Sequence, residues 1–157
     1  MKIVKKIVLF LLVIFVIAQF FGPEKNEGEF SSLDAFIAET NPPANVKGIM
    51  KESCFDCHSD KTNYPWYFNV TPVNYWIADH IEEGKSELNF SKWASYSLKR
   101  KEHKMDEVWE EVKKKEMPLD SYTWTHSEAN LSQDEIDLVV SWAQKVQADY
   151  KSQLTTE

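Results

Sequence analysis

Apolar residues recur at helical spacing in four separate stretches of this 157-residue chain. The first two follow proline-containing breaks at 41–43 and 71–72, and the third is a strongly charged stretch over residues 100–116. The fourth begins at a capping-box sequence, SQDE at 132–135, and continues to about residue 150. No stretch alternates for long enough to predict a strand. The pattern therefore predicts an all-α domain of about four or five helices with long loops.

Polar residues and glycine suggest where these helices begin and end. Asn41 is expected to cap the helix that leads into residue 54, because a proline can occupy the first helical turn behind it. Gly84 is expected to stop the helix that starts after residue 72. Ser91 is expected to cap a short helix, and Pro118 to end the charged one.

The N-terminal 22 residues differ in character from the rest. Residues 7–22 are apolar apart from Gln19 and follow Lys2, Lys5 and Lys6. A signal peptide needs a small-residue cleavage site, and none is evident, so residues 1–22 are predicted to be a membrane anchor, with a cleaved signal as the alternative. A polar linker over 23–30, a helical domain over 31–150 and a polar tail over 151–157 complete the predicted organisation.

The charge of the chain limits its partners. The formal net charge is −7, and without the three N-terminal lysines the remaining 15 basic and 25 acidic residues give 15 − 25 = −10. Phosphates would be repelled by such a surface, so nucleic acid is not expected as a partner. A basic redox protein would be attracted to it.

The only two cysteines form the motif Cys54-Phe55-Asp56-Cys57-His58. Two cysteines separated by two residues, with a histidine directly after the second, are the attachment pattern of a c-type haem. Each thiol can form a thioether to one vinyl group of the porphyrin, and the adjacent imidazole can reach the iron. The motif therefore predicts one covalently bound haem c, with His58 as the proximal iron ligand.

Other chemistry is possible for the two cysteines but fits less well. A thioredoxin-type dithiol belongs in a βαβ context, which the helical pattern lacks. A zinc site needs four ligands, and the other histidines are isolated in the sequence. A disulfide between Cys54 and Cys57 would close a tight, strained loop.

The sixth iron position has several candidates. Met117 is followed by Pro118, which fixes the backbone where an extended loop could hold the sulfur against the iron. His126 lies in a loop beside an aromatic residue, and His80 shares an apolar helix face. His103 stands among charged residues and is interpreted as a solvated surface residue. An open sixth position is a further alternative.

The order of these features resembles that of class I cytochromes c: a motif helix, CxxCH, a long middle segment, Met-Pro and a capped C-terminal helix. Residues of about 42–148 resemble, more specifically, the bacterial haem-binding-domain family of small membrane-tethered proteins. The matching stretches are CFDCHS at 54–59, TNYPWY at 62–67, LNFSKW at 88–93 with Gly84, and MPLDSY at 117–122 with HSEA at 126–129 and LS at 131–132. The resemblance implies covalent haem, a cytochrome c-like fold and Met117 as the distal ligand.

These features predict an electron carrier that cycles between Fe(III) and Fe(II) and performs no bond-making chemistry. The alternatives are a haem-based sensor or a peroxidase-like enzyme with an open or displaceable sixth ligand, and a module whose haem only stabilises the fold. Haem attachment in bacteria takes place outside the inner membrane, and the lysines before the apolar segment favour the cytoplasm. The domain is therefore expected in the periplasm, on a single-pass inner-membrane tether.

Overall fold

A computed structural model describes residues 2–156, and this part of the chain is helical apart from loops and one isolated β-bridge between Glu27 and Lys61. The all-α prediction is confirmed, although the helices are more numerous than expected. The α-helices are α1 (Lys2–Ala18), α2 (Asp34–Thr40), α3 (Ala44–Ser53), α4 (Phe55–His58), α5 (Val73–Glu87), α6 (Leu98–Lys114), α7 (Asp120–Thr123) and α8 (Gln133–Leu154). The 3-10 helices are η1 (Phe30–Leu33), η2 (Trp66–Asn69), η3 (Phe90–Ser95) and η4 (Ser127–Ala129).

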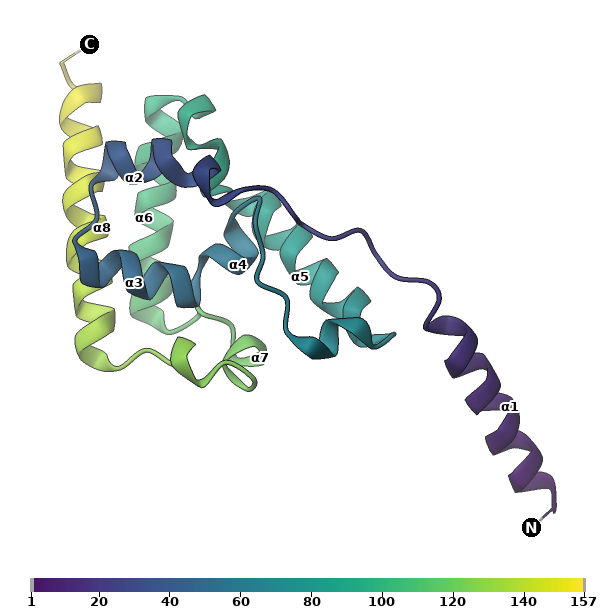
Figure 1. The fold of residues 1–157 in the computed structure, drawn as a ribbon. Coiled ribbons are helices and arrows are strands. Elements are labelled where there is room, and N and C mark those ends of the chain that lie inside the picture. Colours follow the sequence, from purple (N-terminus) through teal and green to yellow (C-terminus); the bar gives the residue numbers. More distant parts are fainter. Residues whose placement is uncertain (1, 157) are drawn as a thin grey trace.

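The two long helices α6 and α8 lie side by side and form one wall of the domain (Figure 1). Helix α3, which leads into the cysteine motif, packs against α8, while α5 packs against α4. The charged helix α6 buries Met105 and Val112 and leaves most of its charged residues at least partly accessible, as its amphipathic pattern predicts. The core therefore lies between α8 and the segments on either side of the motif.

Aromatic side chains fill the centre of this core. The ring centroid of Phe36 lies 4.4 Å from that of Phe90 and 5.1 Å from that of Trp93, and all three side chains are buried. The buried indole N–H of Trp142 donates to the carbonyl oxygen of Thr40 at 3.2 Å, and that of Trp93 donates to the Tyr150 hydroxyl at 3.2 Å. These bonds satisfy the polar atoms that burial of tryptophan removes from water.

Three of the predicted helix boundaries are wrong, for different reasons. Asn41 ends α2 in the left-handed conformation, with φ 41°, and Pro43 occupies the N-cap position of α3. Asparagine tolerates that conformation, so it can end a helix as well as begin one. Gly84 does not stop α5, which continues to Glu87. The predicted Ser91 cap is also replaced, by Asn89, whose side chain accepts from the Ser91 N–H.

The capping box at the start of α8 is confirmed. The Ser132 hydroxyl accepts from the Glu135 N–H, and the Glu135 carboxylate accepts from the Ser132 N–H at 2.8 Å. Helix α8 then continues to Leu154, so the first residues of the predicted polar tail are helical.

The N-terminal helix α1 projects away from the rest of the domain (Figure 1). It contains 17 residues and ends at Ala18, before the last apolar residues of the segment predicted as an anchor. Among the described residues, no helix combines the length and the apolar character that crossing a membrane requires. The interpretation of residues 1–22 as a membrane anchor, or alternatively as a cleaved signal, stays a prediction.

Candidate functional site

The cysteine motif occupies a single helical turn directly after α3. The N–H of His58 donates to the carbonyl oxygen of Cys54 at 3.0 Å, which closes the turn α4. Phe55 anchors the turn, because its side chain is buried in the core against Phe36 and Phe90. The two cysteines and the histidine are therefore held in one rigid turn at the edge of the core.

Gly84 lets helix α5 approach this turn closely. A Cβ atom added at Gly84 would lie 2.8 Å from the carbonyl oxygen of Cys57 and 3.2 Å from its Cβ. Contacts with a backbone atom at that distance do not occur between real Cβ atoms and their neighbours, so only glycine fits without a shift. The glycine that was predicted to end α5 instead sets the spacing between α5 and the motif.

The two thiols are half-buried and are not joined by a disulfide. Burial, and secondly the neighbouring Cys57, raise the pKa of Cys54 to about 12. Burial, and secondly the Asp56 carboxylate, raise the pKa of Cys57 to about 11. Neutral, shielded thiols are poor nucleophiles and poor redox dithiols.

Within residues 2–156 there is also no group of three or more histidine, cysteine or carboxylate side chains that could hold a metal ion alone.

The His58 ring is oriented by the backbone at the end of α5. Its Nδ1 atom lies 3.0 Å from the carbonyl oxygen of Leu88, which can only accept, so Nδ1 carries the proton. Burial lowers the pKa of the His58 imidazole below its usual value, although the bond to Leu88 opposes that effect. The neutral ring therefore keeps its lone pair on Nε2, the arrangement found in histidines that bind metals.

Two cavities flank His58, and Met117 lines both of them. One, of about 260 Å³, is lined by Cys54, His58 and Met117 together with apolar residues, mainly from α3, α6 and α8, and three glutamates, Glu87, Glu107 and Glu111. The other, of about 170 Å³, is lined by Cys57, His58, Met117 and Gly84 among others. The two cavities share His58 and Met117 in their walls, and one is lined by each cysteine, so we call the pair the motif slot.

The end of α6 places Met117 there. Lys115 closes the helix in the left-handed conformation, with φ 62°, and the N–H of Met117 donates to the carbonyl oxygen of Glu111 at 3.3 Å. The Met117 side chain is partly buried and packs against the hydrophobic core. Met117 therefore lines the motif slot although it lies 59 positions after His58 in the sequence (117 − 58 = 59).

The residues of the motif slot fit a haem. The slot offers two thiols for the vinyl groups, an imidazole with its lone pair available, a thioether and largely apolar walls. Ser53 lines both cavities, and its hydroxyl oxygen is buried and has no hydrogen-bond partner within the described residues. A bound group that carries a polar atom would satisfy this orphaned hydroxyl.

Comparison with protein families agrees with this geometry. A family model described as a haem-binding domain matches residues 13–145. The chain belongs to the haem-binding-domain family. No curated protein and no solved structure matches the chain. The haem-binding domain thus covers the cysteine motif, the motif slot and most of α8.

The other histidines of the haem-binding domain line fewer of the slot's two cavities than Met117 does. His80 lines only the smaller of the two slot cavities, and its Nδ1 lies 2.8 Å from the carbonyl oxygen of Trp76. His126 lines neither and stacks on Tyr122, with ring centroids 4.1 Å apart. His103 is exposed and lies 3.2 Å from Glu107, as expected of a surface residue. Among the predicted distal ligands, Met117 shares the most space with His58.

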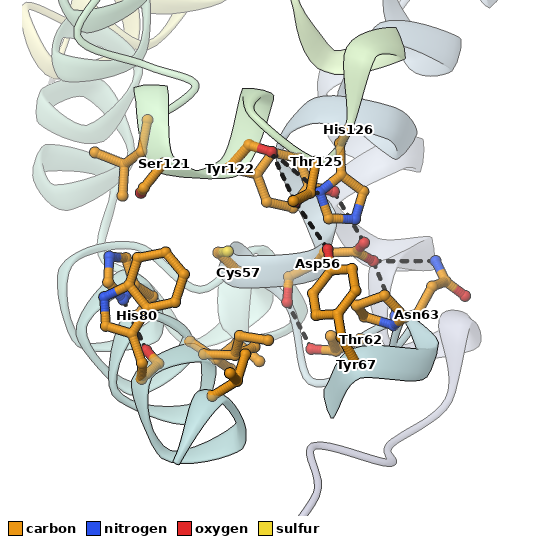
Figure 2. A pocket seen from close by; sticks show the side chains of 16 residues that line it. Asp56, Cys57, Thr62, Asn63, Tyr67, His80, Ser121, Tyr122, Thr125 and His126 are labelled. Atoms are coloured by element: carbon orange, nitrogen blue, oxygen red, sulfur yellow. Dashed lines mark hydrogen bonds between the residues drawn. The ribbon is translucent and has the colours of Figure 1, made fainter. Parts of the chain in front are cut away.

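A third cavity, of about 320 Å³, lies between α5, α7 and the loop after the motif (Figure 2). Its walls are mainly apolar, and Cys57, His80 and His126 line it. At one side the Tyr122 hydroxyl donates to the Asp56 carboxylate at 3.0 Å. Burial, and then this carboxylate, raise the pKa of Tyr122 above its usual value, so it stays a neutral donor.

Sequence reasoning missed the groups that support the motif from outside it. The Leu88 carbonyl belongs to the backbone and has no residue signature. Gly84 had a signal that was misinterpreted, because a glycine inside a helical pattern commonly marks a close contact. Residues 23–30 of the haem-binding domain, predicted as a plain linker, are hydrogen-bonded to the loop that follows His58.

Proposed function

We propose that this haem-binding domain is a monohaem c-type electron carrier, with haem c attached to Cys54 and Cys57. His58 is the proposed proximal ligand and Met117 the distal one. The observation that supports the proposal best is that His58 and Met117 line the same two cavities, one beside each cysteine. Two thioether sites and two axial ligands around one slot match the needs of one six-coordinate haem.

The bound haem would supply the redox chemistry, an exchange of one electron between Fe(III) and Fe(II). The protein residues bind and tune it. The Leu88 carbonyl holds the proton on Nδ1 of His58, so that Nε2 can donate to the metal. A methionine sulfur opposite histidine raises the reduction potential relative to two histidines. With both cysteines in thioether bonds and both axial positions filled by His58 and Met117, no protein group would be left at the iron to activate a substrate, which supports a carrier and not an enzyme.

The proposed partner is a redox protein with a basic docking surface, because the chain carries a formal net charge of −7. Nucleic acid would be repelled by the same charge. The proposed location is the periplasmic side of the inner membrane, where thioether attachment takes place. Residues 1–22 would direct the chain there, as an anchor or as a cleaved signal.

Potentiometry combined with visible spectroscopy tests the proposal. A carrier cycles reversibly with a one-electron dependence, and His58→Ala abolishes the low-spin spectrum while His103→Ala leaves it unchanged. His103 is a suitable control because it is exposed and pairs with Glu107. A haem that cannot be reduced and reoxidised reversibly would contradict electron carriage.

A second candidate is supported by the third cavity, which adjoins the Cys57 side of the slot and holds His80 and His126. A haem-based sensor or a peroxidase-like enzyme needs such space for a small ligand, and a displaceable sixth ligand. Rapid binding of carbon monoxide by the reduced wild-type protein would support this candidate. Slow or absent binding would support the carrier, because a bound Met117 blocks the position.

A further inference from the structure

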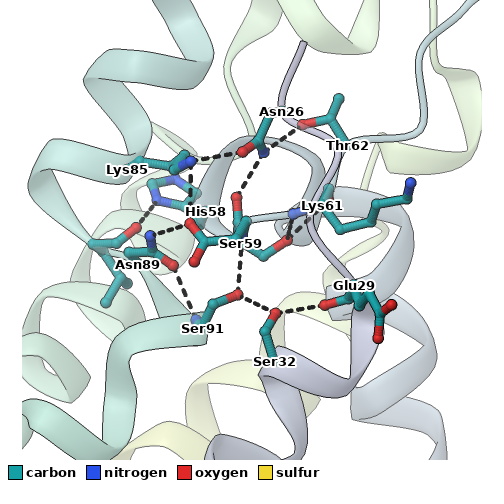
Figure 3. Close-up of polar contacts among 12 residues, drawn as sticks. Asn26, Glu29, Ser32, His58, Ser59, Lys61, Thr62, Lys85, Asn89 and Ser91 are labelled. Atoms are coloured by element: carbon teal, nitrogen blue, oxygen red, sulfur yellow. Dashed lines mark hydrogen bonds and ion pairs between the residues drawn. The ribbon is translucent and has the colours of Figure 1, made fainter.

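The segment before the helical domain is bound tightly to the loop that follows the motif (Figure 3). The N–H of Gly28 donates to the carbonyl oxygen of Asp60 at 2.7 Å, and the N–H of Thr62 donates to that of Asn26 at 3.1 Å. These two bonds surround the isolated bridge between Glu27 and Lys61. We call residues 26–28 the proximal strap, because the loop that they bind begins one residue after His58.

Asn26 is the centre of the proximal strap. Its side-chain amide donates to the carbonyl oxygen of Ser59 at 2.8 Å and to the Thr62 hydroxyl at 3.0 Å. Its side-chain oxygen accepts from the Lys85 ammonium group at 2.6 Å. Both amide hydrogens and the carbonyl oxygen are therefore used, and the three partners come from the motif loop and from α5.

The same ammonium group continues the network toward the residue that orients His58. Lys85 Nζ lies 3.1 Å from the Asp60 carboxylate, and the Asn89 amide donates to that carboxylate at 2.8 Å. Lys85 and Asn89 lie on either side of Leu88 in the sequence. Residues on both sides of Leu88 therefore contact the Asp60 carboxylate, and Asp60 lies two positions after His58. The network thus links the backbone around the Leu88 carbonyl to the loop that follows His58.

Gly28 permits this close approach. A Cβ atom added at Gly28 would collide with the carbonyl oxygen and the Cβ of Asp60. The residue at this position of the strap must therefore lack a side chain for the Gly28–Asp60 hydrogen bond to form. An added methyl group would lift the strap from the loop without touching the Asn26 side chain.

We propose that Asn26 is a positioning residue for His58, acting through Lys85, Asp60 and Asn89 on the hydrogen bond between His58 and Leu88. The inference rests on the proposed role of His58 as an iron ligand. A hydrogen bond from Nδ1 makes the imidazole a stronger electron donor, which favours Fe(III). Removing Asn26 weakens that bond and raises the reduction potential. The N-terminal segment thus acts on the electronic properties of the iron.

The test compares Asn26→Ala with Asn69→Ala in the holoprotein. Asn69 is an exposed asparagine whose amide donates only to Trp66, outside the strap network. The readouts are the reduction potential and the solvent exchange of the His58 Nδ1 proton, followed by NMR in the reduced state. Asn26→Ala is expected to raise the potential and to make this proton exchange about tenfold faster, as loss of local hydrogen-bond protection predicts. Asn69→Ala is expected to change neither.

A purely structural role predicts a different result: Asn26→Ala would lower the unfolding midpoint and leave both readouts equal to those of Asn69→Ala. That result would overturn the inference while leaving the proposed function intact. If Asn26→Ala does not mature, Lys85→Met and Gly28→Ala perturb the same strap from either side and carry the same expectation. A wild-type protein without covalent haem would instead contradict the proposed function itself.

Discussion

Replacing Gly84 with alanine tests the packing of α5 on the cysteine motif. The added Cβ would lie 2.8 Å from the carbonyl oxygen of Cys57, so α5 or the motif turn must move. Gly48 is a matched control within α3, because an added Cβ there meets nothing within 4 Å. Both substitutions remove glycine from a helix interior, which by itself stabilises by about 1 kcal/mol.

The two substitutions should therefore change the free energy of unfolding in opposite directions, or Gly84→Ala should leave it almost unchanged. Gly48→Ala is expected to raise the free energy of unfolding by about 0.5–1 kcal/mol. At Gly84 the same gain is opposed by an overpacking cost of about 1–3 kcal/mol, so the net effect runs from near zero to a loss of about 2 kcal/mol. Because the clash falls on the carbonyl of Cys57, Gly84→Ala should also reduce the haem content per chain.

Urea unfolding followed by circular dichroism measures the free energies, and the m-value shows whether the compared states are alike. Haem content follows from absorbance per mole of protein. If Gly84→Ala stabilised the protein as much as Gly48→Ala and kept full haem content, the close approach of α5 to the motif would be refuted.

Two further predictions concern the distal ligand and the last helix. Met117→Ala should abolish the weak long-wavelength absorption band of iron–sulfur coordination and allow rapid carbon monoxide binding, whereas His126→Ala should leave both unchanged; persistence of the band would exclude Met117 as a ligand. Hydrogen bonds from the Ser132 hydroxyl, and secondly from the Ser132 N–H, hold the pKa of Glu135 below its usual value. The Glu135 carboxylate therefore contributes to the cap at neutral pH, and this contribution is lost as the pH falls through that lowered pKa. Glu135→Gln should therefore cost up to about 1 kcal/mol at neutral pH, since the site is exposed, and almost nothing in acid. An equal cost at both pH values in denaturant titrations would contradict the carboxylate's part in the cap.

Local sequence signals predicted the features that depend on local interactions. The capping box at Ser132 was predicted correctly because all its partners lie within one helical turn. The amphipathic pattern of α6 likewise predicted its buried face. The spacing of Cys54, Cys57 and His58 likewise predicted that these residues share one turn of chain.

Long-range contacts explain what the sequence could not predict. Gly84 was assigned to a helix end because its partner, Cys57, lies 27 positions away and leaves no local trace (84 − 57 = 27). Asn41 satisfies two capping rules, and only the path of the chain decides between them. The proximal strap depends on Asn26 meeting residues from two distant segments, which composition presented only as a polar linker.

Covalent attachment of haem is the central claim, and acid–acetone extraction tests it most directly. The full chain is produced in a host with an active cytochrome maturation system, and the Cys54→Ala/Cys57→Ala variant serves as the control. The wild-type polypeptide is expected to remain coloured after extraction, while the variant loses its colour to the organic phase. A colourless wild-type polypeptide with two titratable thiols would contradict the account.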